Sequence, residues 1–170
     1  MGSGLNLSAP EPLSAHHRID GFDSGVPSLD DWLRRRAGQN RASGATRTLV
    51  SCNDGRRVVA YYALASSAVA PAAAPGRFRR NMPDPIPVEV LARLAISRTH
   101  QGQGLGRALF QDAARRVIHA AELIGIRGLL VHAISEDAKA FYLRLGLDQS
   151  PLDPMTLMTT VADLEAALAP

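Results

Sequence analysis

A glycine-rich turn between an apolar strand and a long helix constrains this chain more than any other feature. The apolar pattern predicts a strand over 88–97, a loop over 99–106 and an amphipathic helix over 105–123. Glycines let successive backbone N–H groups point at one spot, and the start of a helix adds partial positive charge. The segment therefore predicts a seat for a phosphate group.

The spacing of the glycines excludes two common nucleotide-binding loops. A Walker A loop needs Gly-Lys-Ser/Thr, which is absent, and a G-x-G-x-x-G pattern would place its last glycine at Arg107 or Leu109. The spacing that fits is Gln/Arg-x-x-Gly-x-Gly/Ala, found here as Gln101-Gly102-Gln103-Gly104-Leu105-Gly106. This segment resembles the pyrophosphate loop of the GNAT acetyltransferases.

A second segment supports the same resemblance. A strand is predicted over 126–134, followed by a helix that Ser135 caps and Gly146 ends. The run from Ser135 to Leu147 is similar to the later GNAT motif N-x-x-A-x-x-F-Y-x-x-x-G-F, with Phe141 and Tyr142 in place. It departs from the motif at Ser135, where asparagine is usual, and at Leu147, where phenylalanine is usual.

The resemblance implies a fold and a cosubstrate. The expected GNAT fold is α/β (α+β), with a mixed, mostly antiparallel central sheet flanked by helices and strands splayed at the acetyl-CoA site. One domain would cover residues 1–170, with residues 1–8 disordered or tag-derived. The resemblance makes Tyr142 the general acid that protonates the departing coenzyme A thiolate. The implied acetyl-CoA-binding residues are Leu94, Ala95, Ile96, Gln101, Gly102, Gln103, Gly104, Leu105, Gly106, Arg107, Ser135, Lys139 and Phe141.

The rest of the chain completes an alternation of helices and strands. Ser28 is predicted to cap a helix that carries Leu29, Trp32 and Leu33 on one face. Strands over 46–52 and 58–64 should form a hairpin around the turn 53–55, and 155–161 should form the last strand. Residues 68–87 are predicted to be a long loop or a broken short helix.

The basic residues are unevenly distributed. Nearly all are arginine, and the segment 34–80 holds ten arginines against one acid, Asp54, for a net charge of +9. The whole chain carries +3, so the remainder carries −6. This asymmetry favours a polyanionic partner, because the planar guanidinium donates two hydrogen bonds to a phosphate. The other interpretation is that the arginines face different ways and solvate the surface.

The first half of the chain narrows the resemblance. The runs 9–14, 29–33, 44–48 and 79–88 are similar to the TacT-like GNAT toxins, which acetylate aminoacyl-tRNA and stop translation. That resemblance implies aminoacyl-tRNA as substrate, a ribbon-helix-helix antitoxin, a homodimer, and operator DNA bound only through the antitoxin complex. The residues expected to contact RNA are Arg34, Arg35, Arg36, Arg79, Arg80 and Arg93.

Two alternatives remain open at this stage. Glu89 lies where histone-type lysine acetyltransferases have a glutamate base, so the substrate could instead be a lysine or a polyamine. The chain could also be a non-catalytic acetyl-CoA-binding module or a co-repressor. Arg93 could simply pair with Glu89 on its own strand.

Composition limits the setting. Cys52 is the single cysteine, so no internal disulfide can form, and the predicted location is the cytoplasm. Cys52 itself is predicted to be a small strand residue. No apolar run approaches the ~20 residues of a membrane span. The five histidines lack metal-ligand spacing, so no metal is expected.

Overall fold

The computed structural model describes residues 6–35 and 46–169. Its elements in chain order are β1 (Glu11–Pro12), α1 (Pro27–Arg35), β2 (Arg47–Cys52), β3 (Val58–Val69), η1 (Pro71–Ala73), α3 (Gly76–Arg79), β4 (Ile86–Ile96), η2 (Arg98–His100), α4 (Leu105–Leu123), β5 (Gly128–His132), α5 (Glu136–Arg144), β6 (Asp148–Gln149), β7 (Thr156–Thr160) and α6 (Val161–Leu168).

The chain divides into two compact units that interleave along the sequence. The first unit comprises Met1–Ala65 and Arg93–Asp112, and the second comprises Ser66–Ala92 and Ala113–Pro170. β3, β4 and α4 therefore each contribute residues to both units. The single domain over residues 1–170 stays a prediction.

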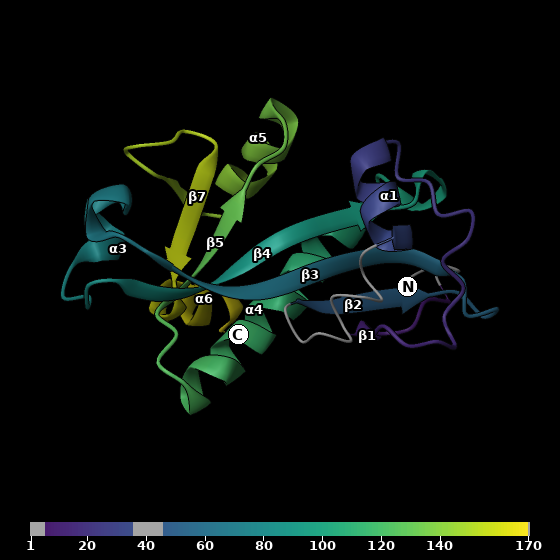
Figure 1. The fold of residues 1–170 in the computed structure, drawn as a ribbon, viewed down its shortest axis with the longest axis horizontal. Coiled ribbons are helices and arrows are strands. Elements are labelled where there is room, and N and C mark those ends of the chain that lie inside the picture. The colour runs from purple at the N-terminus through teal and green to yellow at the C-terminus, as the bar shows by residue number, and fades with distance from the viewer. Residues whose placement is uncertain (1–5, 36–45, 170) are drawn as a thin grey trace. The chain divides into compact units, whose positions relative to one another are not determined.

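The strands form one mixed sheet with the order β1-β2-β3-β4-β5-β7-β6. β4 and β5 pair in parallel, whereas β1–β2, β2–β3, β5–β7 and β6–β7 pair antiparallel. Figure 1 shows β5 and β7 side by side. The parallel pairing runs from Val88 to Leu91, and β4 continues beyond it to Ile96. The predicted mixed, mostly antiparallel sheet is confirmed.

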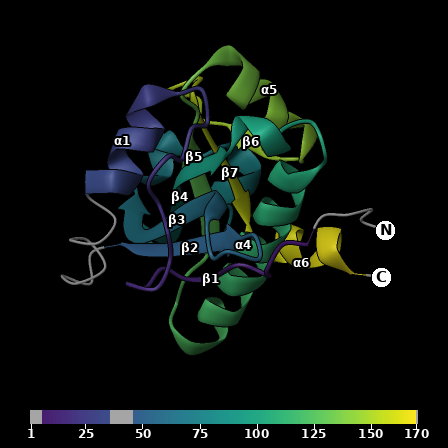
Figure 2. The ribbon, with the colours of Figure 1, turned by 90° about the vertical axis from the view of Figure 1, so that its right-hand side faces the viewer.

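The first unit is built on the β2–β3 hairpin. The predicted pairing is confirmed, with Arg47 opposite Leu64. The helix α1 packs on this hairpin (Figure 2), where the Trp32 ring stacks on Tyr61 at 5.8 Å between ring centroids. The Tyr61 hydroxyl donates a hydrogen bond of 2.7 Å to the Leu29 carbonyl. Burying each large apolar side chain stabilises the unit by roughly 1.5–3 kcal/mol.

The second unit packs α3 against β5 and β7. Phe78 of α3 is 2% exposed and lies in a core cluster with Ile86, Val88, Leu130 and Met158, among others. A Cβ at Gly128 would lie 2.5 Å from the Phe78 ring and 2.5 Å from the Thr159 carbonyl oxygen. Only glycine therefore lets the Phe78 ring approach β5, and this contact fixes the short helix that carries Arg79.

Several predicted boundaries were wrong. The helix α1 begins at Pro27, so Ser28 is inside it and does not cap it. Proline suits the first helical position, and the Val26 carbonyl accepts the first bonds from the amides of Leu29 and Asp30. β3 runs on to Val69, five residues past the predicted end, and the last strand ends at Thr160.

Four elements were not predicted: β1, β6, α6 and the 3-10 turn η2, most of which lies in the predicted loop 99–106. The strands β1 and β6 have two residues each, too few for a periodic signal. The helix α6 follows β7 without a loop, because the Thr160 side chain accepts from the Asp163 amide and caps it. The broken short helix expected over 68–87 is confirmed as η1 and α3. None of the helices in the described part of the chain is long and apolar enough to cross a membrane.

Candidate active site

The glycine turn after β4 has the geometry of an anion seat. Gly102 and Gly104 have φ angles of +76° and +82°, in the left-handed region that favours glycine. A Cβ at either position would meet no heavy atom of the described residues within 4 Å, so this side of the turn is open. The α4 ladder starts where the Ala108 amide donates to the Gly104 carbonyl at 3.2 Å. The amides of 105–107 precede that bond and have no partner within the helix, which is what a bound anion needs.

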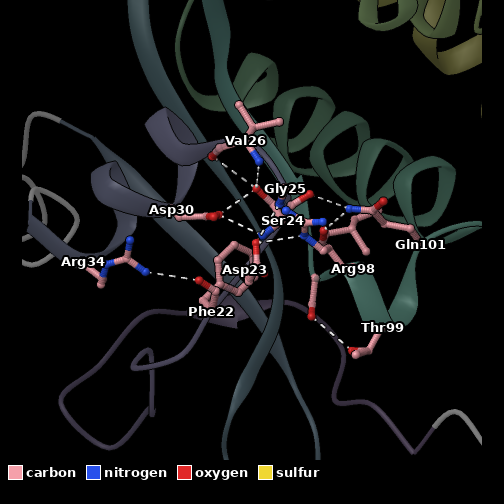
Figure 3. A network of polar contacts seen from close by, with 12 residues as sticks. Phe22, Asp23, Ser24, Gly25, Val26, Asp30, Arg34, Arg98, Thr99 and Gln101 are labelled. Carbon is pink, nitrogen blue, oxygen red and sulfur yellow. Dashed lines mark hydrogen bonds and ion pairs between the residues drawn. The ribbon is translucent and has the colours of Figure 1, made fainter.

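The side chain of Gln101 holds this turn in place. Its Nε2 donates to the Ser24 carbonyl at 2.7 Å and to the Ile96 carbonyl at 2.8 Å (Figure 3). The Arg98 amide donates to the Asp23 carbonyl at 2.9 Å, and its guanidinium pairs with the Asp23 carboxylate at 3.1 Å. That guanidinium and the Gly25 amide hold the pKa of the Asp23 carboxyl below its usual range. The segment 23–26 thus braces the turn, which sequence analysis missed.

The end of β4 leads into the turn. Ala95 is buried at 4% exposure, whereas Leu94 and Ile96 are half-buried. The Ser97 amide donates to the Val59 carbonyl at 2.8 Å, which ties the end of the strand to β3 within the first unit. Pairing of the backbone of 94–96 with a pantetheine arm stays a prediction.

The second GNAT motif forms α5 as predicted. The Ser135 hydroxyl accepts from the Ala138 amide at 3.1 Å, which confirms it as the N-cap. Gly146 follows the helix with a φ of +99°, the usual conformation after a C-terminus. The ring of Phe141 meets that of Tyr142 edge-on, with 5.0 Å between centroids. Tyr142 is 8% exposed, and burial raises the pKa of its hydroxyl.

The Tyr142 hydroxyl is protonated at neutral pH, as its predicted role requires, and its raised pKa makes it a weaker acid than an ordinary tyrosine. A general acid must hold its proton until the leaving group needs it, and burial disfavours the phenolate. Lys139 is half-buried on the same helix, and its contact with the coenzyme stays a prediction.

The arginines of α1 are partly neutralised by an acid on the same helix. Asp31 pairs with Arg34 at 2.9 Å and with Arg35 at 3.3 Å. The Arg34 guanidinium also donates to the Phe22 carbonyl at 3.2 Å (Figure 3). Both pairs are exposed, so each contributes only about 0–1 kcal/mol and leaves the cations open to exchange partners. Arg36 lies outside the described residues.

The structure brings Arg35 and Arg93 together in one depression of the first unit. Its volume is about 270 Å³. The Arg93 guanidinium carbon lies 5.3 Å from the centre of the Trp32 ring, a cation–π contact. Tyr61 stacks on the same ring, so Trp32 supports Arg93 in addition to forming part of the apolar face predicted for this helix. The lining residues are Ser28, Asp31, Trp32, Arg35 and Arg93.

The remaining predicted RNA-contacting arginines lie on or beside α3. Arg79 and Arg80 are exposed, and Arg80 lines a groove of about 530 Å³ in the second unit. Arg77 makes a bidentate pair with Asp163, at 2.7 and 3.1 Å. This pair lowers the pKa of the Asp163 carboxyl.

The +9 segment is therefore not a bare cationic surface. Among its described residues, acids from elsewhere in the chain pair with Arg34, Arg35, Arg57 and Arg77. The negative charge of the remaining sequence is used in part for this purpose, which sequence analysis did not foresee.

Glu89, the candidate base, is half-buried on β4. The Ser66 hydroxyl donates to its Oε1 at 3.2 Å. Burial raises the pKa of this carboxyl, and the hydrogen bond from Ser66 opposes the shift. These properties alone do not distinguish a base from a strand carboxylate.

One cluster in the first unit combines metal-ligand types, namely Glu11, His17 and Cys52, with candidate atoms within 4.8 Å of one another. The His17 Nδ1 accepts from the Ser14 amide at 2.9 Å, so the neutral ring carries its proton on Nε2. That Nε2 lies 2.8 Å from Glu11 and donates to it, which leaves no lone pair for a metal. Burial raises the pKa of the Cys52 thiol to about 11. The cluster fits a hydrogen-bonded packing arrangement.

Comparison with known proteins agrees with this geometry. The acetyltransferase (GNAT) domain family matches residues 46–146. The tRNA-acetylating toxin of Mycobacterium tuberculosis strain H37Rv is 51% identical over 95% of this chain and 96% of its own. A structure of AtaT complexed with acetyl-methionyl-tRNAfMet has a TM-score of 0.89 at 30% identity, covering 96% of this chain and 99% of that chain.

A further solved structure, a tyrosine-to-phenylalanine mutant of KacT, has a TM-score of 0.87 at 32% identity and covers 95% of this chain and 98% of that chain. With the glycine turn, the capped α5 and the mixed sheet in place, the chain belongs to the GNAT family, the acetyltransferases that use acetyl-CoA.

Proposed function

We propose that this enzyme transfers the acetyl group of acetyl-CoA to the α-amine of aminoacyl-tRNA and acts as a toxin that blocks translation. The observation that carries the proposal is the 51% identity to a tRNA-acetylating toxin along 95% of the chain. That identity extends beyond the two GNAT motifs into the arginine-rich first half of the chain.

The chemistry of the site suits an α-amine. Such an amine has a pKa of ~7.7–8.0, against ~10.4 for lysine, so about a tenth of it is already unprotonated at neutral pH. The amine nitrogen attacks the thioester carbonyl carbon, and the carbon–sulfur bond breaks. The departing thiolate takes the proton of Tyr142, which recovers it from solvent, while the new amide nitrogen loses its proton to water. A strong general base is not required.

Arginines supply the affinity for the RNA backbone in this proposal. Arg93 is the best placed of these, because its cation–π contact with Trp32 restrains the guanidinium before RNA binds. Arg35 lines the same depression and can exchange Asp31 for a phosphate. The proposed RNA contacts are Arg34, Arg35, Arg36, Arg79, Arg80 and Arg93.

We propose further partners from the same relationship. AtaT has been solved with the C-terminus of its antitoxin AtaR and acetyl-CoA, and the AtaT–AtaR complex has been solved on DNA. By analogy, a cognate antitoxin of the ribbon-helix-helix type neutralises this enzyme, and operator DNA is bound only through that complex. We propose a homodimer that works in the cytoplasm.

A labelling experiment tests the acceptor. The purified protein is incubated with [14C]acetyl-CoA and charged tRNA, and with uncharged tRNA, a lysine peptide and a polyamine in parallel. Label is expected only on charged tRNA, released as an acetyl-amino acid when the ester is hydrolysed. Mass spectrometry of tRNA-bound amino acids after induction then identifies the preferred one.

The half-buried Glu89 supports one competing function. With a base of raised pKa, the enzyme could deprotonate a lysine or a polyamine. Label on the peptide or polyamine that disappears in Glu89→Gln would establish this alternative and reject the proposed one. Coenzyme A binding without any transfer would establish a non-catalytic module.

A further inference from the structure

A buried carboxylate on α1 is linked to the glycine turn by a chain of hydrogen bonds. Asp30 is 6% exposed, and its Oδ1 accepts from the Ser24 amide at 3.0 Å and from the Ser24 hydroxyl at 2.6 Å. The Ser24 carbonyl in turn accepts from the Gln101 side chain at 2.7 Å. Figure 3 shows Asp30, Ser24 and Gln101 in this order.

Asp30 depends on Ser24 for its hydrogen bonds, because a buried carboxylate is costly unless donors satisfy it. Ser24 supplies two donors to the same oxygen, which fixes both its amide and its side chain. The same hydroxyl accepts from the Val26 amide at 3.2 Å, so hydrogen bonds hold the backbone on both sides of the Ser24 carbonyl, the group that Gln101 bonds.

Gln101 connects the Ser24 carbonyl to the glycine turn. Its side-chain amide has two N–H donors, and it uses them on the carbonyls of Ser24 and Ile96. Gln101 therefore bridges the segment before α1 and the end of β4, immediately before the left-handed Gly102.

A second link runs in parallel but is exposed. The side chains of Arg98 and Asp23 are 66% and 59% exposed, and such pairs contribute little in water. Beside the backbone bond from the Arg98 amide to the Asp23 carbonyl, the partly buried link through Asp30 is the one that ends on Gln101, at the start of the turn.

We propose that Asp30 is a positioning residue for acetyl-CoA binding, acting through Ser24 and Gln101 on the amides of the glycine turn. The inference rests on the proposed use of that turn for the pyrophosphate, and it is independent of which amine accepts the acetyl group.

Coenzyme A affinity in a double-mutant cycle tests this role. Isothermal titration gives the dissociation constant for the wild type, Asp30→Ala, Gln101→Met and the double variant. Each single change is expected to weaken binding on the order of tenfold, the loss of one or two hydrogen bonds. The double variant is expected to be no weaker than the worse single variant, because both changes break one chain.

Two further variants separate positioning from general destabilisation. Asp30→Asn keeps an acceptor oxygen for Ser24, so it should restore binding to within about threefold of the wild type. Ser51→Ala removes a partly buried hydrogen bond to the Ser8 carbonyl elsewhere in the first unit and should leave the affinity unchanged. At saturating acetyl-CoA, Asp30→Ala should retain the wild-type kcat.

Several results would overturn the proposal. The first is an unchanged coenzyme A affinity in folded Asp30→Ala. The second is a double variant whose affinity falls about a hundredfold, because the two effects are then independent. The third is a loss of kcat in Asp30→Ala at saturating acetyl-CoA. If Asp30→Ala does not fold, Gln101→Met at its exposed site decides, and unchanged affinity there rejects the role. Normal coenzyme A binding by a wild type that does not acetylate charged tRNA would reject the proposed function and leave this inference standing.

Discussion

Replacing Gly104 with alanine tests the left-handed backbone of the turn. The φ of Gly104 is +82°, and an added Cβ would meet no heavy atom of the described residues within 4 Å. The cost is therefore conformational, about 1–2 kcal/mol for a residue with a Cβ. In a chain of this length each kcal/mol lowers Tm by about 2–4 °C. The Tm of Gly104→Ala should fall by about 2–8 °C.

The same change should weaken coenzyme A binding, because the new methyl group projects from the turn that is proposed to hold the pyrophosphate. Coenzyme A at 100 times its dissociation constant stabilises the wild type by about 2.7 kcal/mol. If affinity falls on the order of tenfold, the same concentration stabilises the variant by only about 1.4 kcal/mol. Thermal unfolding with and without coenzyme A measures both effects.

Gly125→Ala is the matched control. Gly125 also has open space around a Cβ but lies outside the left-handed region, so its Tm and its response to coenzyme A should match those of the wild type. A full coenzyme A response in Gly104→Ala would refute the pyrophosphate seat. An unchanged Tm without ligand would refute the argument from backbone conformation.

Three further predictions follow from the site. Tyr142→Phe should lower kcat by about 10²–10⁴-fold without changing coenzyme A affinity, and an equal kcat in the variant would remove Tyr142 from the mechanism. Because burial raises the pKa of Tyr142, the kcat of the wild type should not fall as the pH rises through 10, the ordinary pKa of tyrosine. Arg93→Ala should weaken tRNA binding and reduce by about 1 the slope of log affinity against log salt concentration, whereas Arg115→Ala, which removes the same charge, should not. Equal slopes in the two variants would show that Arg93 does not contact a phosphate. Since the pKa of Cys52 is raised from 9.0 to about 11, its thiolate at pH 8 is about a hundredfold scarcer than that of an ordinary cysteine. Mass spectrometry should therefore find that iodoacetamide labels Cys52 at least that much more slowly in the native than in the unfolded protein. Equal labelling rates would contradict the burial of Cys52.

Structural features that depend on residues close together in the sequence were predictable. The bounds of α4, the Ser135 cap and the GNAT family depend on glycine spacing, capping residues and helical periodicity, and all three are confirmed. The start of α1 was missed because Pro27 and Ser28 both carry a helix-start signal, and the fold selected proline at the first position.

The partners of polar side chains were not predictable in this way. Gln101 and Ser24 are 77 positions apart, and Arg77 and Asp163 are 86 apart. Sequence analysis placed Trp32 only on one face of its helix, because nothing near it in sequence indicates that Arg93 covers its ring.

The sequence by itself thus determined the family, the cosubstrate and the conformation of the turn proposed to bind it, because backbone conformation at glycines and caps is set by local sterics and local hydrogen bonds. Only the tertiary structure decided which residues hold that turn and which arginines are neutralised by acidic side chains. A charged or polar side chain can pair with any complementary group, and only folding determines which of these groups comes within about 3 Å of it.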